Sequence, residues 1–64
     1  MDRAEFISEV EAFRQEMEEI ERESRKYAKV ARPTKFEQAE QDARIARLET
    51  IKQKIDALVA RFRQ

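Results

Sequence analysis

The stretch VARPTKFE, from Val30 to Glu37, contains the only proline of a 64-residue chain that has no glycine. Proline inside a helix removes one hydrogen bond and clashes with the preceding turn, at a cost of about 3 kcal/mol. It also disfavours the helical conformation of Arg32, the residue before it. Directly after Pro33, the residues from Thr34 to Glu37 fit the S/T-x-x-E capping box that starts many helices. The stretch therefore predicts the end of one helix and the start of another.

Apolar side chains recur at alternating steps of three and four residues on both sides of this stretch. A 3.5-residue period of this kind is typical of a coiled-coil seam. The predicted hairpin core comprises Phe6, Val10, Phe13, Met17 and Ile20 before the proline and Leu48, Ile51, Ile55, Leu58 and Phe62 after it. Most other residues are Glu, Arg, Lys, Gln and Ala, which favour helices. We predict one helix over about residues 3–31, a turn at 32–34 and a second helix over about residues 34–63.

The two halves of the seam pair with each other about the proline. Phe6 with Phe62 and Phe13 with Ile55 are two of five apolar pairs whose residue numbers add to 68, which centres the pairing on residue 34. An antiparallel hairpin requires this symmetry, whereas a kinked continuous helix gives no reason for it. The sequence thus predicts an all-α fold, in which residues 1–64 form a single coiled-coil-like antiparallel hairpin of two helices.

A hairpin of 64 residues has little core of its own. At this size the free energy of area burial and the ordering entropy, ~1.5 kcal/mol per residue, nearly cancel. We therefore expect the hairpin to complete a four-helix bundle, either as a homodimer or by packing on a larger protein. The predicted oligomer face comprises Ile7, Ala39, Ala43, Ala46, Ala57, Val59 and Ala60. Alanine is also the best helix former at exposed positions, so the alanines equally fit a solvated surface.

Charge is distributed unevenly along a chain whose 14 basic and 14 acidic side chains cancel. Residues 1–31 carry −3, from six basic and nine acidic side chains, and residues 32–64 carry +3, from eight and five. Residues 22–35, around the turn, carry six basic side chains against one glutamate, or +5. Such a tip can dock an acidic protein or a nucleic acid backbone, and basic side chains here also complement the helix dipole. The candidate partner-binding tip comprises Arg25, Lys26, Tyr27, Lys29, Arg32, Lys35 and Phe36.

The residues of most common catalytic and cofactor sites are missing from this chain. It has no cysteine and no histidine, so thiolate nucleophiles, imidazole bases and the usual zinc ligands are absent. We expect no catalytic residue, no cofactor, no metal site and no small-molecule substrate, and a hairpin this thin should have no pocket of ~300 Å³ or more. No apolar run approaches the ~20 residues of a membrane span, and the N-terminus lacks the pattern of a secretory signal. We therefore expect no membrane association and a cytoplasmic location.

These features together predict a non-enzymatic protein–protein interaction module that acts through an amphipathic helical hairpin, as a small adaptor, co-chaperone or inhibitor. Its partner is expected to be a second copy of the chain or a larger protein. The alternative is a dimeric four-helix-bundle regulator that binds nucleic acid, RNA in particular, through phosphate contacts of the basic tip. Because acidic residues crowd the first helix between Glu16 and Glu23, nucleic acid would contact the tip more readily than the shaft.

Overall fold

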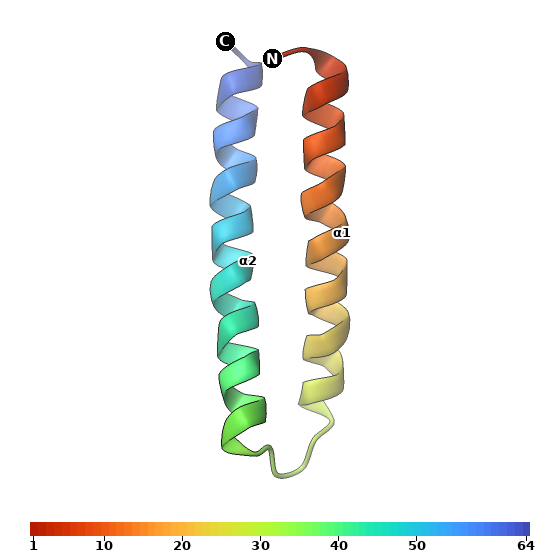
Figure 1. The fold of residues 1–64 in the computed structure, drawn as a ribbon, viewed down its shortest axis with the longest axis vertical. Coiled ribbons are helices and arrows are strands. Elements are labelled where there is room, and N and C mark those ends of the chain that lie inside the picture. The colour runs from red at the N-terminus through yellow and green to blue at the C-terminus, as the bar shows by residue number, and fades with distance from the viewer.

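The computed structural model describes all 64 residues as two helices joined by one loop. Helix α1 spans Arg3–Ala28 and helix α2 spans Lys35–Phe62. The helices lie antiparallel and side by side, and both chain ends lie at the end opposite the loop (Figure 1). The Cα trace measures 48 × 15 × 12 Å, so the molecule is a thin rod. The predicted all-α antiparallel hairpin is confirmed, whereas its completion to a four-helix bundle stays a prediction.

The loop is longer than the sequence predicts because α1 ends early. The helix ends at Ala28, three residues before its predicted end, and its C-cap amide of Lys29 donates to the Lys26 carbonyl at 3.1 Å. The connection therefore covers residues 29–34 instead of 32–34. A helix commonly reverses direction through a glycine at positive φ, but this chain has no glycine and no residue with positive φ. It leaves α1 through a longer path past Pro33 instead.

The start of α2 contains the capping box that the sequence predicts. The Glu37 amide donates to Thr34 Oγ1 at 3.1 Å, and the Thr34 amide donates to the Glu37 carboxylate at 2.9 Å. The first amides of a helix have no carbonyl in a preceding turn to bond to. The capping box gives acceptors to two of these amides at the start of α2. At the start of α1, the Asp2 carboxylate accepts from the Glu5 amide at 2.8 Å. Both helix starts are therefore set by side chains close in sequence.

The seam between the helices is only partly covered. Ile51 is completely inaccessible and Leu58 keeps 6% of its surface exposed, and these are the only buried residues of the chain. At the open end, Phe6 and Phe62 stack with ring centroids 4.4 Å apart and planes 17° apart. This pair belongs to the predicted register, in which the residue numbers add to 68. Because each helix has only one neighbour, the rest of the seam stays half-buried or exposed.

Near the loop, hydrogen bonds replace apolar packing between the helices. Gln41 Nε2 donates to Ser24 Oγ at 3.1 Å, and Arg44 Nη1 donates to Gln41 Oε1 at 2.6 Å. The predicted register places Ser24 opposite Arg44, and the structure joins these two residues through Gln41. The polar end of the seam is thus held by a network that all three side chains share.

Truncation of the most buried side chain tests the core. Ile51→Ala should lower the free energy of unfolding by about 2–5 kcal/mol, because it leaves a cavity where the side chain is fully enclosed. The control is Val30→Ala in the loop, where the side chain is 38% exposed and a change within about 0.5 kcal/mol is expected. Urea unfolding at one fixed protein concentration measures both variants. Equal losses would show that Ile51 does not lie at the centre of the core.

Removal of one cap tests the helix start. Thr34→Ala should cost about 0.5–2 kcal/mol of stability, because the Glu37 amide loses its acceptor. The matched control is Thr50→Ala within α2, where the Thr50 hydroxyl donates to the Ala46 carbonyl at 3.2 Å. There alanine favours the helix, so no loss is expected. Thermal unfolding followed by circular dichroism compares the two variants, and a larger loss from Thr50→Ala would contradict the role of the capping box.

Candidate functional site

The residues that flank the seam give the hairpin two different broad faces. We call one of them the charged face; its flanking rows, at seven-residue spacing, are Glu9, Glu16 and Glu23 in α1 and Arg47, Lys54 and Arg61 in α2. We call the opposite one the apolar face; its flanking rows are Ile7, Arg14 and Glu21 in α1 and Ile45, Lys52 and Val59 in α2. The two faces differ in charge pairing and in shape.

One ion pair joins the helices across the charged face. Arg47 Nη2 donates to Glu16 Oε1 at 2.9 Å, and Arg47 Nε donates to the other oxygen of the same carboxylate. The other ion pairs of the hairpin lie within α1. The hydrogen bond from Arg47 lowers the pKa of Glu16 below its ordinary value of 4.5. Since Glu16 is ionised at neutral pH, this two-pronged contact closes the middle of the charged face.

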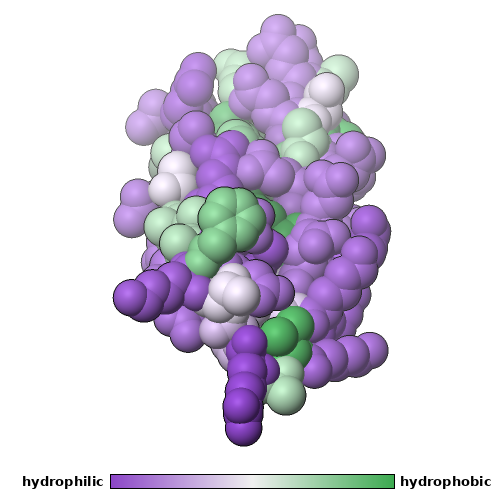
Figure 2. Space-filling model, turned by 60° about the horizontal axis from the view of Figure 1, so that its bottom comes forward, coloured by the Kyte–Doolittle hydropathy of each residue, from purple (hydrophilic) through white to green (hydrophobic).

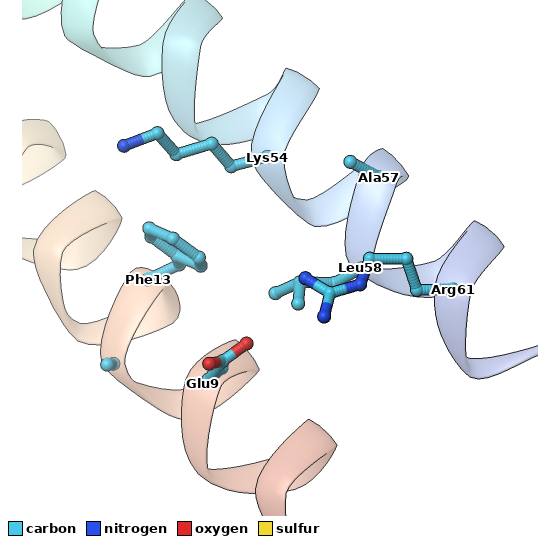
Figure 3. A pocket seen from close by; sticks show the side chains of 7 residues that line it. Glu9, Phe13, Lys54, Ala57, Leu58 and Arg61 are labelled. Atoms are coloured by element: carbon cyan, nitrogen blue, oxygen red, sulfur yellow. The ribbon is translucent and has the colours of Figure 1, made fainter. Parts of the chain in front are cut away.

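A groove opens in the charged face near the chain ends (Figure 3). Its volume is about 340 Å³, and Phe13 and Leu58 are among the apolar side chains that line it. Glu9 from α1 and Arg61 from α2 point toward one another beside it (Figure 3), and Lys54 Nζ lies 5.9 Å from the centre of the Phe13 ring. The expectation that the hairpin has no hollow of this size is wrong, because side chains of the two helices line an open space of about 340 Å³ here. The groove is an open, mostly apolar trough with charged rims.

The apolar face has no comparable hollow. None of its flanking residues lines any of the four hollows of the surface. Ile7 is 49% exposed and Ile45 is 52% exposed, and Val59 is half-buried. Four half-buried seam residues, which also line no hollow, continue this apolar surface: Val10, Met17, Leu48 and Ile55. The face therefore has an even apolar strip over residues 7–17 of α1 and 45–59 of α2.

The tip has an exposed aromatic ring among basic side chains. Phe36, in the first turn of α2, is 72% exposed, and hydrophilic side chains surround a few hydrophobic ones at this end of the molecule (Figure 2). Four basic residues of the tip are exposed and form no ion pair: Arg25, Lys29, Arg32 and Lys35.

Acidic side chains also reach one side of the tip. Lys26 pairs with Glu23 at 3.2 Å, and the half-buried Tyr27 lines a hollow of about 200 Å³. Glu37 and Glu40 of α2 line the same hollow as Glu23 of α1. The charge of +5 was counted over residues 22–35, and Glu37 and Glu40 follow that segment in sequence, so the count does not include them. The tip is therefore basic over the loop and mixed in charge along its side.

The structure divides the predicted oligomer face among three surfaces. Ile7 and Val59 belong to the apolar face, while Ala43 and Ala57 line hollows on the side of the charged face. The remaining alanines are exposed on the outer side of α2: Ala39, Ala46 and Ala60. Ile45 flanks the seam together with Ile7 and Val59, and its spacing of fourteen residues from Val59 places both in one row, although the predicted oligomer face does not include it.

No group of three acidic side chains is arranged to hold a metal ion. Neither helix contains a stretch that is long and apolar enough to cross a lipid bilayer. Comparison of the chain with models of protein families, with curated proteins and with solved structures finds no match.

The ion pair across the charged face makes stability depend on pH. A carboxylate whose pKa is lowered by folding stabilises the folded state above its unfolded pKa, and this stabilisation is lost as pH falls through the folded pKa. We therefore expect Arg47→Met to destabilise the protein at neutral pH and to have a shrinking effect as pH falls below 4.5, the ordinary pKa of Glu16. Thermal midpoints at fixed protein concentration, measured over a pH series, report this difference.

The matched control for this prediction is Arg61→Met. Arg61 lies in the same row as Arg47 but forms no ion pair. The difference between this variant and the parent protein should change less with pH. A pH-independent effect of Arg47→Met would mean that the contact with Glu16 adds nothing to stability.

Proposed function

We propose that this protein is a non-enzymatic protein–protein interaction module, acting as a small adaptor, co-chaperone or inhibitor, and that its apolar face packs against helices of another protein chain. The observation that carries this proposal is the poor enclosure of its core. Only Ile51 and Leu58 are buried among 64 residues, while Ile7 and Ile45 are about half-exposed on one face. Apolar side chains arranged in a strip, with charged residues beside them, are typical of a surface that another chain covers.

Energetic considerations support an assembled state. Full burial of an isoleucine or leucine side chain contributes about 1.5–3 kcal/mol relative to exposure. The hairpin alone does not gain much of this free energy along the apolar face, because one neighbouring helix covers only one side of each seam residue. A partner that binds the folded hairpin and not the unfolded chain stabilises it by mass action. Two further helices, from a second copy or from a larger protein, would enclose the seam as in a four-helix bundle.

The groove of the charged face also fits recognition of a protein chain. Its apolar floor includes Phe13 and Leu58, and Glu9, Lys54 and Arg61 stand at its rims. An apolar anchor residue with charged neighbours matches such a trough, as buried anchors with a polar rim do in protein interfaces. The cytoplasmic location expected from the sequence stays a prediction.

A second candidate function is nucleic-acid binding at the tip. The observation that favours it is the exposed Phe36 ring at the same end of the hairpin as the unpaired Lys29, Arg32 and Lys35. Aromatic rings that stack with bases, together with cations that contact phosphates, are the common elements of single-strand binding. The glutamates on the side of the tip oppose this role. We therefore rank it below protein interaction.

Charge placed on one face at a time tests the proposed function. Ile45→Asp should abolish assembly of the protein with itself or with a captured partner, because the aspartate would be desolvated in the interface. The matched control is Ala43→Asp on the charged face, which should leave assembly intact. Sedimentation at micromolar concentration and affinity capture, each with a helicity measurement by circular dichroism, compare the variants. A folded, stable monomer that captures no protein would contradict the proposal, and salt-sensitive RNA binding lost in Phe36→Ala would favour the second candidate.

A further inference from the structure

We infer that the occupant of the apolar face is a second copy of this chain, packed face to face with its loop at the opposite end. The inference rests on the proposed function, because it names the partner of the same surface. It follows from the order of charges along the flanking rows of that face. Two hairpins that bury one face symmetrically have two arrangements, with the loops at opposite ends or at the same end, and these rows favour the first.

The row on α1 complements itself in the opposed arrangement. Arg14 and Glu21 are seven residues apart, or about 10 Å along the helix. When α1 packs antiparallel on α1 of the second copy, with the symmetry axis between residues 17 and 18, each Arg14 faces Glu21 of the other chain. Symmetry makes this contact twice.

The adjoining outer row of α1 strengthens the same arrangement. It contains Glu11, Glu18 and Arg25 at seven-residue spacing. About the same axis, Glu11 faces Arg25 of the other chain, again twice. Glu18 lies near the axis and faces its own copy, but Arg14 of the same helix is 3.8 Å away and offsets this like charge. Opposite charges therefore outnumber like charges along α1.

The flanking row on α2 packs on its own copy about the same axis. In the register of the hairpin, residue 17 of α1 lies level with residue 51 of α2, so the axis passes between residues 50 and 51. Lys52 of this row then lies level with Glu49 in the adjoining outer row of the second copy, and also within one helical turn of the second copy's Lys52. Ile45 comes within one helical turn of Val59 of the second copy. Ile45, which is 52% exposed in the hairpin, would thus be covered by the second copy at both ends of the interface.

The arrangement with both loops at one end opposes like charges instead. There α1 packs on α2 of the second copy, and residues at the same height face each other. Arg14 would face Lys52, and Glu18 would face Glu49. The two basic loops, each with unpaired Lys29 and Arg32, would also lie side by side. Like charges placed directly opposite destabilise an interface, so this arrangement is disfavoured.

The area of the face suits a stable dimer. Cα extents of 48 Å and 15 Å give the face a flat area of roughly 720 Å². Two copies that covered this whole outline would bury about 1,400 Å² in total, toward the lower end of the ~1,200–2,000 Å² of specific protein interfaces. The even surface of the apolar face, without hollows, allows two such faces to pack closely over this area.

The distance between the two loops of a dimer tests the arrangement directly. The chain has no cysteine, so Arg32→Cys places a single nitroxide label on each loop of the full-length protein. Pulsed electron–electron resonance should give a distance on the order of the 48 Å length of the hairpin. Loops at the same end would instead lie within about 20 Å, given helix spacings of ~8–10 Å. The shorter distance would overturn the inference.

Charge reversal supplies an independent measurement. Arg14→Glu should raise the dissociation constant of the dimer several-fold, because it places glutamates opposite Glu21 in both copies. Adding Glu21→Arg should restore the dimer, since the two reversed residues face each other. In the arrangement with both loops at one end, position 14 faces Lys52, so Arg14→Glu would lower the dissociation constant. A lower dissociation constant would therefore contradict the inference. Sedimentation equilibrium with monitoring of helicity measures all three proteins.

Failure of this inference differs visibly from failure of the proposed function. If the protein stays monomeric and folded at all concentrations, the second copy is not its partner. Capture of a larger protein that Ile45→Asp abolishes and Ala43→Asp preserves would then uphold the interaction module while overturning the dimer. A folded protein that neither forms a dimer nor captures a larger protein would overturn both proposals.

Discussion

The apolar seam between two helices is the interaction on which the rest of this structure depends. It determines the antiparallel arrangement, brings Phe6 against Phe62 at the open end and encloses Ile51 at the centre. Two helices in contact along one line nevertheless cannot surround a core, because every seam residue has a neighbouring helix on one side only. The same geometry that creates the fold therefore leaves apolar surface unused, and this surface is the basis of the functional proposal.

The two faces of the hairpin differ in whether an ion pair joins the helices. On the charged face, opposite charges of α1 and α2 meet, and the contact of Glu16 with Arg47 closes the gap between the helices. On the apolar face, no ion pair joins the helices, and isoleucines are exposed at intervals along the strip. Charges on the first face stabilise the hairpin itself, whereas charges on the second have no cross-helix partner within the chain. The latter are thus available to select a partner and its direction.

Much of the fold was predictable because its signals are either local or strictly periodic. The capping box needs only Thr34 and Glu37, three residues apart, and both of its hydrogen bonds form. The end of α1 at Ala28 was less predictable, because helix ends without a glycine cap depend on where the loop must cross to the next helix. The predicted oligomer face stays a prediction, and the structure places its alanines on several surfaces, because the rotation of α2 decides which of them lie beside the seam.

The sequence by itself determined the two helices, their antiparallel direction and the register of their seam, because apolar spacing and helix caps act between residues a few positions apart. Tertiary structure alone decided which flank closes through an ion pair, where a groove opens, and how acidic residues of α2 reach the side of the basic tip. Glu16 and Arg47 are 31 residues apart, and their contact depends on how each helix is rotated about its own axis. That rotation results from packing of the whole seam, which no short stretch of sequence specifies.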